Sequence, residues 1–265
     1  MKEKLHRLLE RLKACGSLVV ALSGGVDSST LAKAASLALG DKAVAVTAFS
    51  ELLSAEELSD AKAMAESIGI RHYLIAAGDL DDPAVVRNNR ERCYHCKRGR
   101  FGKLCAWARE NGFAHVADGS NLDDRSDYRP GMRALAELAP TVISPFMECG
   151  WTKADIRAQA RAWGLAVADK PGAACLASRI EYGLPLTAER LSQVETAERM
   201  IRPYVTGQLR VRHHGSLARI ETEPASFPSV LEHHEEIAAA LGALGFTYTA
   251  LDLLGYRTGS TNETL

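Results

Sequence analysis

Short apolar runs alternate with amphipathic stretches along the first two thirds of the chain. Each apolar run has the length of a buried strand, whereas the stretches between the runs repeat their apolar residues at helical spacing. The runs predict strands over residues 18–22, 42–49, 71–76, 114–117 and 141–146. The stretches predict helices over residues 27–39, 54–68, 98–111 and 152–164. Because strand and helix alternate, we expect a parallel, doubly wound α/β sheet with helices on both faces.

The order of elements changes after the Gly-Leu-Pro segment at residues 183–185. The pattern beyond it predicts a helix over residues 187–201, strands over 209–213 and 217–221, a helix over 228–244 and a last strand over 247–253. We therefore expect two domains, a large α/β domain over residues 1–183 and a small α+β domain over residues 184–265. The second domain is too small to build a large core alone, so we expect it to pack on the first domain or on a neighbouring subunit.

Composition narrows the class of partner. The formal net charge is −1 over 265 residues, so no global field recruits RNA or an anionic membrane, and we expect neither as a partner. No apolar run approaches the roughly 20 residues that span a bilayer, and the charged start reads as an amphipathic helix rather than a signal peptide. We therefore expect a cytoplasmic protein, in which the six cysteines do not pair as disulfides.

A turn with two adjacent glycines joins the first strand to the first helix of the alternating pattern. Its sequence, residues 23–28, is Ser-Gly-Gly-Val-Asp-Ser. Gly24 and Gly25 let the backbone turn sharply, and the free N–H groups at the helix start point at an anion. Ser23 and Ser28 can add hydroxyl donors, and Asp27 can hold Mg²⁺ or brace the loop. The turn therefore predicts a phosphate-binding site.

This loop lacks the Gly-Lys-Ser/Thr ending of a Walker A sequence, so it belongs to another class. It resembles the PP-loop of ATP pyrophosphatases, which have an adenine nucleotide hydrolase-like fold. Those enzymes cleave ATP to AMP and pyrophosphate and so activate an oxygen of the substrate by adenylation. The alternative interpretation is an ordinary glycine-rich turn.

A second polar loop follows the strand predicted at residues 114–117. It contains Asp118, Asn121 and Asp123, at the carboxyl end of a strand, where open α/β sheets bind ligands. These side chains are candidates for metal or ribose contacts. A solvated turn explains the same spacing equally well.

Three cysteines are candidates for metal ligands. Cys93 and Cys96 have the spacing with which two thiolates bind one metal ion from a single turn. No second pair of cysteines or histidines follows at the spacing of a zinc site. With Cys175 as a distant third ligand, the set suits a [4Fe–4S] cluster with one open iron. The alternative is that Cys93 and Cys96 are unrelated and that Cys175 is simply buried. We interpret Cys15, Cys105 and Cys149 as small residues of the apolar core.

Further motifs extend over nearly the whole chain. They are residues 23–28, 92–97 (Arg-Cys-Tyr-His-Cys-Lys), 118–121 (Asp-Gly-Ser-Asn), 127–133 (Asp-Tyr-Arg-Pro-Gly-Met-Arg), 144–146 (Ser-Pro-Phe), 170–171 (Lys-Pro), 175–179 (Cys-Leu-Ala-Ser-Arg) and 251–259 (Leu-Asp-Leu-Leu-Gly-Tyr-Arg-Thr-Gly). Together, and in this order, they resemble the LarE family of ATP-dependent sulfur transferases of the PP-loop superfamily.

The resemblance implies a role in making the nickel-pincer nucleotide, the cofactor of lactate racemase. The family uses ATP and Mg²⁺ to adenylate a carboxylate of pyridinium-3,5-biscarboxylic acid mononucleotide and then replaces oxygen by sulfur. In one branch the sulfur comes from a cysteine of the enzyme, which becomes dehydroalanine, and Cys175 matches that position. In another branch a [4Fe–4S] cluster carries the sulfur. Because Cys93 and Cys96 are present, the resemblance favours the cluster, with Cys175 and Asp27 in the catalytic roles.

The resemblance also implies binding residues and an assembly. The nucleotide would be bound by Ser23, Gly24, Gly25, Asp27, Ser28, Asp118 and Asn121. The substrate would be bound by Ser178, Arg179, Arg210, Arg212, Glu198 and Glu221. Arginine forks suit a phosphate and a carboxylate, and Arg210 and Arg212 would lie on the same side of one strand. Arg210 and Arg212 also fit a solvent-facing strand, and Glu198 and Glu221 fit surface ion pairs. Members of the family form trimers that pair into hexamers.

Three other functions are compatible with part of this pattern. A tRNA thiolase also combines a PP-loop with cysteines, but the near-neutral charge and the later motifs disfavour it. An amide-forming ligase would not need Cys93, Cys96 and Cys175 together. A nucleotide-sensing module without turnover would not need an intact loop over residues 23–28.

Overall fold

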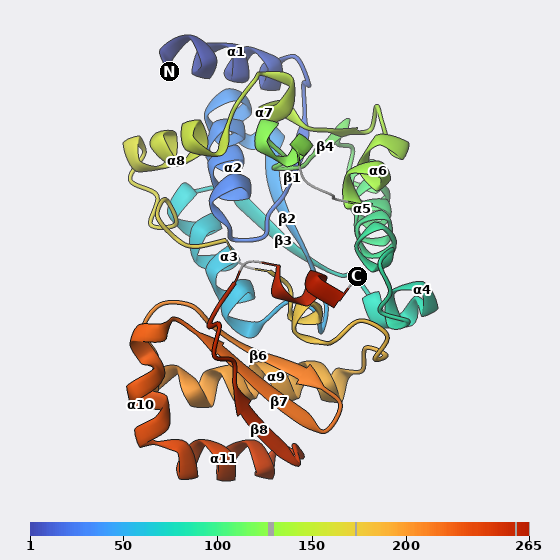
Figure 1. Ribbon diagram of the computed structural model, residues 1–265. Helices are drawn as coiled ribbons and strands as arrows, with labels where there is room; N and C mark the ends of the chain where they lie inside the picture. Colours follow the sequence, from blue (N-terminus) through green and yellow to red (C-terminus); the bar gives the residue numbers. More distant parts are fainter. Residues whose placement is uncertain (127–129, 173, 258, 265) are drawn as a thin grey trace. The chain divides into compact units, whose positions relative to one another are not determined.

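The computed structural model describes residues 1–126, 130–172, 174–257 and 259–264 (Figure 1). Part of the motif over residues 127–133 and Thr258 of the last motif lie outside the described residues. The chain forms two compact units. The first unit comprises Met1–Asp79 and Cys93–Ala173, and the second unit comprises Leu80–Arg92 and Ala174–Leu265.

The first unit is built on a five-stranded sheet. Its strands, in spatial order, are β3 (Arg71–Ala76), β2 (Ala43–Phe49), β1 (Leu18–Ala21), β4 (His115–Ala117) and β5 (Val142–Ile143). Every neighbouring pair is parallel. The expected α/β class is therefore confirmed, with β1 at the centre and its carboxyl end next to those of β2 and β4.

Helices cover both faces of this sheet (Figure 1). One face carries α1 (Lys2–Lys13), α2 (Val26–Leu39), α3 (Ala55–Ile68) and α8 (Lys153–Ala162), and the other carries α5 (Arg92–Glu110) and α6 (Pro130–Glu137). Strand β1 has apolar side chains on both faces of the sheet, so helices must cover both faces. Leu18 and Val20 enter the core on the α2 side, and Val19 enters the core on the α5 side. All three side chains are therefore buried, as expected for a central parallel strand.

Predicted capping boxes are present at the N-termini of two of these helices, α3 and α8. The Ser54 hydroxyl accepts a hydrogen bond from the Glu57 amide at 3.2 Å, and the Glu57 carboxylate accepts one from the Ser54 amide at 3.1 Å. Gly69 ends α3 in a left-handed conformation with φ of 75°. Thr152 and Asp155 form the same reciprocal cap at the start of α8. Capping boxes are local signals, which is why the sequence could place these helix ends.

Three predicted elements are wrong in extent. The helix expected over residues 98–111 begins at Arg92 in α5 and therefore includes the two cysteines of the motif over residues 92–97. The strand expected over residues 141–146 is confined to β5, and a short helix α7 (Pro145–Glu148) follows it. Pro145 lacks the N–H that a strand would use and suits the first turn of a helix instead. The helix expected over residues 228–244 is two helices, α10 (Phe227–Glu232) and α11 (His234–Ala243). His233 separates them with a non-helical backbone, and its ring bonds to the Ser229 carbonyl oxygen at 2.8 Å.

The second unit is a small α+β structure. Helix α9 (Ala188–Ile201) precedes a sheet with the strand order β6 (Leu209–His214), β7 (Leu217–Thr222) and β8 (Tyr248–Leu251). Strands β6 and β7 are antiparallel, and β7 and β8 are parallel. Apolar residues of α9, β6, β7, α10 and α11 form its core. The small C-terminal sheet expected from the sequence is therefore present.

A segment from the middle of the chain also belongs to the second unit. Leu80–Arg92, which includes helix α4 (Pro83–Val86), packs with the C-terminal part. Asn88 is wholly buried, with a φ of 48°, and its amide nitrogen donates to the Glu181 and Leu184 carbonyl oxygens at 2.8 and 2.9 Å. These hydrogen bonds fasten the segment to the turn that precedes α9. The domain boundary near residue 183 stays a prediction.

The remaining elements are short 3₁₀ turns. They are η1 (Gly40–Lys42), η2 (Asp79–Asp81), η3 (Leu122–Ser126), η4 (Leu176–Arg179), η5 (Arg202–Tyr204), η6 (Pro224–Ser226) and η7 (Ser260–Thr264). Across the described part of the chain, no helix has the length and apolar character needed to cross a bilayer.

Candidate active site

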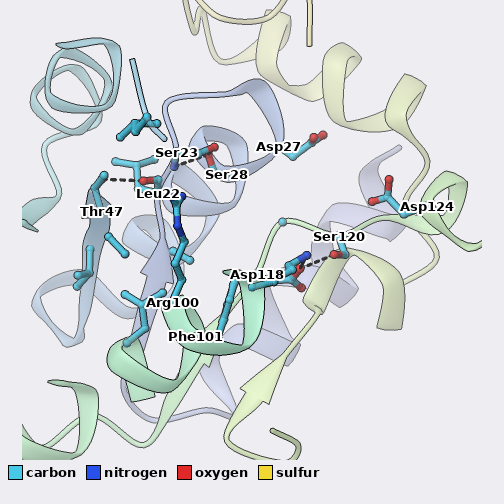
Figure 2. Close-up of a pocket in the computed structure, with 17 residues that line it drawn as sticks. Leu22, Ser23, Asp27, Ser28, Thr47, Arg100, Phe101, Asp118, Ser120 and Asp124 are labelled. Atoms are coloured by element: carbon cyan, nitrogen blue, oxygen red, sulfur yellow. Dashed lines mark hydrogen bonds and ion pairs between the residues drawn. The ribbon is translucent and has the colours of Figure 1, made fainter. Parts of the chain in front are cut away.

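A cavity of about 350 Å³ lies in the first unit, where the loops after β1, β2 and β4 meet α5. Figure 2 shows the side chains that line it. They are Ala21, Leu22, Ser23, Asp27, Ser28, Val46, Thr47, Ala48, Leu53, Lys97, Arg100, Phe101, Leu104, Asp118, Gly119, Ser120 and Asp124. The cavity is large enough for a small ligand and lies at the carboxyl edge of the sheet, where open α/β sheets bind nucleotides.

The loop over residues 23–28 forms one side of this cavity, and the Ser28 hydroxyl fixes its shape. Ser28 Oγ accepts a hydrogen bond from the Ser23 amide at 3.1 Å and donates to the Gly25 carbonyl oxygen at 3.2 Å. Gly25 is the N-cap of α2, so the first amides of α2 lack helical partners and can bind an anion. The loop thus has the shape of an anion cradle, and the binding of a phosphate by it stays a prediction.

Two glycines make the close packing around this loop possible. Gly24 has a φ of 75°, and a Cβ atom on it would lie 2.8 Å from the backbone nitrogen of Ala61 in α3. A Cβ atom on Gly119 would lie 3.1 Å from the Cβ atom of Asp27. Gly24 therefore excludes larger residues, whereas a larger residue at Gly119 would require Asp27 to shift. The sequence singled out Gly24 through its pair of adjacent glycines, whereas Gly119 was named only as part of the motif over residues 118–121.

Asp27 presents a carboxylate at the start of α2. One oxygen forms an ion pair with Lys153, the first residue of α8. The other oxygen, Oδ1, is buried and has no hydrogen-bond partner among the described residues. Burial raises the pKa of Asp27 above its usual value, although the hydrogen bond from Lys153 acts in the opposite direction. An unpartnered carboxylate oxygen beside a phosphate cradle fits a hard cation such as Mg²⁺.

The loop after β4 provides a second carboxylate. Asp118 is 3 % exposed and accepts hydrogen bonds from the Ser120 and Ser144 hydroxyls. The Lys97 ammonium lies 3.6 Å from it. Asp118 therefore lines the cavity as a fixed anionic group with a lysine beside it.

Asn121 has a different environment from Asp118. Its side-chain oxygen accepts a hydrogen bond from the Asp123 amide at 3.1 Å and so shapes the turn. It does not line the cavity, whereas Asp124 does. The Asp123 carboxylate accepts a hydrogen bond from the Lys153 amide at 2.8 Å and so caps α8. A nucleotide contact by Asn121 stays a prediction.

Cys93 and Cys96 lie in the first turns of α5. Residues three apart on a helix share a face, so the two thiols fit a pair of ligands for one metal ion. Cys93 is exposed and Cys96 is half-buried. The Cys96 thiol donates to Asp79 Oδ1 at a sulfur–oxygen distance of 3.5 Å. Within the described ranges, no group of three or more His, Cys, Asp or Glu side chains is arranged to hold a metal ion.

The predicted substrate arginines gather in the second unit. Arg179 forms a bidentate pair with the two carboxylate oxygens of Glu198, at 3.0 and 3.2 Å. Arg212 Nε and Nη2 both donate to one oxygen, Glu221 Oε2, at 2.9 and 2.7 Å. Burial lowers the pKa of Arg210, and the nearby charges of Arg179 and Arg212 lower it further. Glu198 and Glu221 therefore do not form isolated surface pairs; they compensate the charge of a buried arginine cluster.

Cys175 lies in a loop that arginines hold. Arg179 Nη1 donates to the Cys175 carbonyl oxygen at 3.1 Å, and Arg212 Nη1 donates to the Ser178 carbonyl oxygen at 3.0 Å. Arg92 Nη1 donates to the Ala177 carbonyl oxygen at 3.0 Å. The Cys175 thiol is half-buried. The second unit thus brings together Cys175, Ser178, Arg179 and Arg212, and their roles in binding the substrate stay predictions.

Sequence reasoning missed several residues of these sites. They are Asp79, Asn88, Arg100, Gly119 and Lys153. Each acts through a partner far away in the chain, and no local pattern marks such a contact. A position at the carboxyl end of a predicted strand was the available signal for Asp79 and Gly119.

The fold of the first unit and the loop over residues 23–28 together define a class of nucleotide-binding enzymes. A parallel sheet with β1 at its centre, followed by a glycine-serine cradle at the N-terminus of α2, is the nucleotide-binding unit of PP-loop enzymes. In agreement, the model of the NAD synthase family matches residues 1–106.

Comparison with individual proteins narrows the class to a family. The chain is 36% identical to a pyridinium-3,5-bisthiocarboxylic acid mononucleotide synthase of Lactiplantibacillus plantarum, over 99% of this chain and 95% of the relative. It is 38% identical to an uncharacterised protein of Synechocystis, over 100% and 99% of the two chains. A tRNA-specific 2-thiouridylase of Rickettsia felis is 28% identical over 58% of this chain and 52% of its own length. The chain therefore belongs to the LarE family of pyridinium-3,5-bisthiocarboxylic acid mononucleotide synthases.

Proposed function

We propose that this protein inserts sulfur into pyridinium-3,5-biscarboxylic acid mononucleotide in an ATP-dependent reaction, as a step in making the nickel-pincer nucleotide of lactate racemase. The observation that carries the proposal is the preformed cradle around Ser28 in a chain that matches the synthase over its full length. The match to the thiouridylase supports a shared nucleotide-binding part and not a tRNA substrate, because it covers only 58% of this chain.

The first step is adenylation of a substrate carboxylate. A carboxylate oxygen attacks the α-phosphorus of ATP, the bond to the β-phosphate oxygen breaks, and pyrophosphate leaves. The amides at the start of α2 and the hydroxyls of Ser23 and Ser28 would bind the departing pyrophosphate. Asp27 would hold Mg²⁺, which neutralises charge on the phosphates when it is bound. The unpartnered Oδ1 atom of Asp27 supports this assignment.

The second step is delivery of sulfur. A sulfur nucleophile attacks the acyl carbon of the acyl-adenylate, and AMP leaves as the displaced group. The arginine cluster of the second unit would bind the anionic groups of the substrate, and Cys175 lies in the loop that this cluster holds. Arg179 and Arg212 are already paired with carboxylates, so they would act as rigid forks rather than as mobile charges.

The source of the sulfur divides the proposal into two routes. In the favoured route Cys93, Cys96 and Cys175 would hold a [4Fe–4S] cluster, and the chemistry that it would supply is sulfide for the acyl carbon. The spacing of Cys93 and Cys96 on α5 supports it. In the other route the Cys175 sulfur attacks the acyl carbon and displaces AMP. Loss of the Cα proton and cleavage of the Cβ–Sγ bond then release the thiocarboxylate and leave dehydroalanine. Assembly as trimers or hexamers and a cytoplasmic location complete the proposal and rest on the family resemblance.

The reaction can be tested with purified protein, ATP, Mg²⁺ and the biscarboxylic acid mononucleotide. We expect pyrophosphate release that depends on the pyridinium substrate, and a product in which sulfur replaces a carboxylate oxygen, detected by mass spectrometry. Pyrophosphate release without any sulfur-containing product would leave an adenylating enzyme of another kind. Pyrophosphate release that does not depend on the pyridinium substrate would refute the proposal. Incorporation of sulfur only into tRNA would also refute it.

The cluster can be tested by anaerobic purification. We expect brown protein that contains iron, and loss of the colour and the iron in Cys93→Ala, because the cluster would lose one ligand. Cys105→Ala is the matched control, since Cys105 lies on the same helix, packs against the apolar core and has a thiol whose pKa burial raises. Protein that stays colourless after reconstitution with iron and sulfide would contradict the cluster and favour the sacrificial route.

A further inference from the structure

Arg100 lines the cavity, and the roles proposed above for the loop over residues 23–28 and for Cys93 and Cys96 give this arginine no function. Its Nε and Nη2 atoms donate to Asp79 Oδ2 at 2.9 and 2.6 Å, and Nη2 also donates to Ser50 Oγ at 3.0 Å. Asp79 is 4 % exposed, and the hydrogen bonds from Arg100 lower its pKa against the opposing effect of burial. A guanidinium held along one edge in this way has a fixed plane.

Arg100 lies apart from Asp27, the residue proposed to hold Mg²⁺. Figure 2 shows Arg100 and Phe101 on the side of Thr47, apart from Asp27 and Asp124. Ser50 and Asp79, the partners of Arg100, follow β2 and β3 and not β1 or β4. The amides at the start of α2 already provide a phosphate-binding site, so Arg100 is not needed for the phosphates.

The cavity also has an apolar part. Val46, Phe101 and Leu104 line it and belong to one apolar cluster, against which Ala48 packs. Figure 2 shows Asp118, Ser120 and Asp124 apart from Thr47 and Arg100. A ligand whose phosphates lie at the α2 N-terminus would place its flat, weakly polar base on the apolar part. Arg100 therefore lies where the base of a bound nucleotide would be.

We propose that the face of the Arg100 guanidinium stacks on the base of the bound nucleotide, and that Asp79 is a positioning residue that fixes this plane. The proposal rests on the use of the cavity for ATP. Stacking of a base on an arginine plane combines dispersion with attraction between the cation and the ring, and it needs no particular hydrogen-bond pattern. The plane is the essential property, because a lysine at the same position would supply the charge without it.

Binding of AMP and of magnesium pyrophosphate, measured separately by calorimetry, tests the proposal. AMP reports on the base, and pyrophosphate reports on the cradle alone. We expect Arg100→Gln to weaken AMP binding about tenfold, in line with the value of stacking contacts in other proteins, and to leave pyrophosphate binding unchanged. Arg100→Lys should bind AMP as weakly as Arg100→Gln, and Asp79→Asn should weaken AMP binding to a smaller degree.

The matched control is Arg98→Gln on the same helix. The Arg98 side chain is 61% exposed and lies 3.9 Å from Glu137, and it does not line the cavity, so this variant should bind both ligands as the unchanged protein does. Equal AMP affinity in Arg100→Gln would overturn the proposal, and so would full rescue by lysine or a parallel loss of pyrophosphate binding. Failure of the unchanged protein to bind either ligand would instead refute the proposed function itself.

Discussion

Replacing Cys175 with serine is expected to abolish formation of the thiocarboxylate while pyrophosphate release continues. Both routes for sulfur need the Cys175 sulfur, one as the atom transferred and the other as a ligand of iron. Adenylation would use the loop over residues 23–28, Asp27 and the substrate-binding arginines, and Cys175→Ser changes none of these residues. The measurement is mass spectrometry of the product, run in parallel with an assay for pyrophosphate.

Cys149→Ser is the matched control for this variant. Cys149 lies in the first unit, is half-buried, and has a thiol whose pKa burial raises, so its loss should change neither product nor pyrophosphate. Intact mass after one turnover separates the routes: loss of the elements of H₂S at Cys175 indicates sacrifice, and an unchanged mass indicates the cluster. A thiocarboxylate product from Cys175→Ser would contradict both.

Replacing Asp27 with alanine is expected to reduce pyrophosphate release by about a thousandfold, because a metal ion at the phosphates contributes several kcal/mol of transition-state stabilisation. The variant removes the carboxylate with the unpartnered Oδ1 atom and leaves Ser23 and Ser28 unchanged. We therefore expect ATP binding in the absence of metal to persist. The measurement combines initial rates with calorimetric ATP binding at several Mg²⁺ concentrations.

The folding of Asp27→Ala can be checked independently of its activity. The Asp27 side chain is 28% exposed and has one unpartnered oxygen, and its partner Lys153 is 35% exposed, so thermal unfolding should change little. Asp41→Ala, at an exposed position after α2, is the control for charge and should retain full activity. Unchanged release by Asp27→Ala would remove Asp27 from the catalytic role.

Local signals explain which parts of the fold the sequence could predict. The capping box at Ser54, the glycine after α3 and the apolar run of β1 depend on residues that are close together in the chain. Their elements were predicted to within a few residues. Pro145 and His233 show the opposite case, since periodicity alone does not reveal a proline at a helix start or a side chain that interrupts a helix.

The candidate site divides in the same way. The cradle at Ser23 and Ser28 could be predicted because loop and helix are contiguous. The pairing of Asp27 with Lys153, and of Asp79 with Arg100, joins residues that only the folded chain brings together. The grouping of Leu80–Arg92 with the C-terminal part has the same origin, because Asn88 is fastened to carbonyl oxygens far along the chain.

The hydrogen bonds of Ser28 have a thermodynamic consequence. They hold the turn between β1 and α2 in its curved conformation before any ligand arrives. An incoming triphosphate thus meets a receptor whose backbone entropy was lost during folding, and its affinity is not diminished by ordering the loop. We therefore expect the loop over residues 23–28 to bind the triphosphate without changing its conformation.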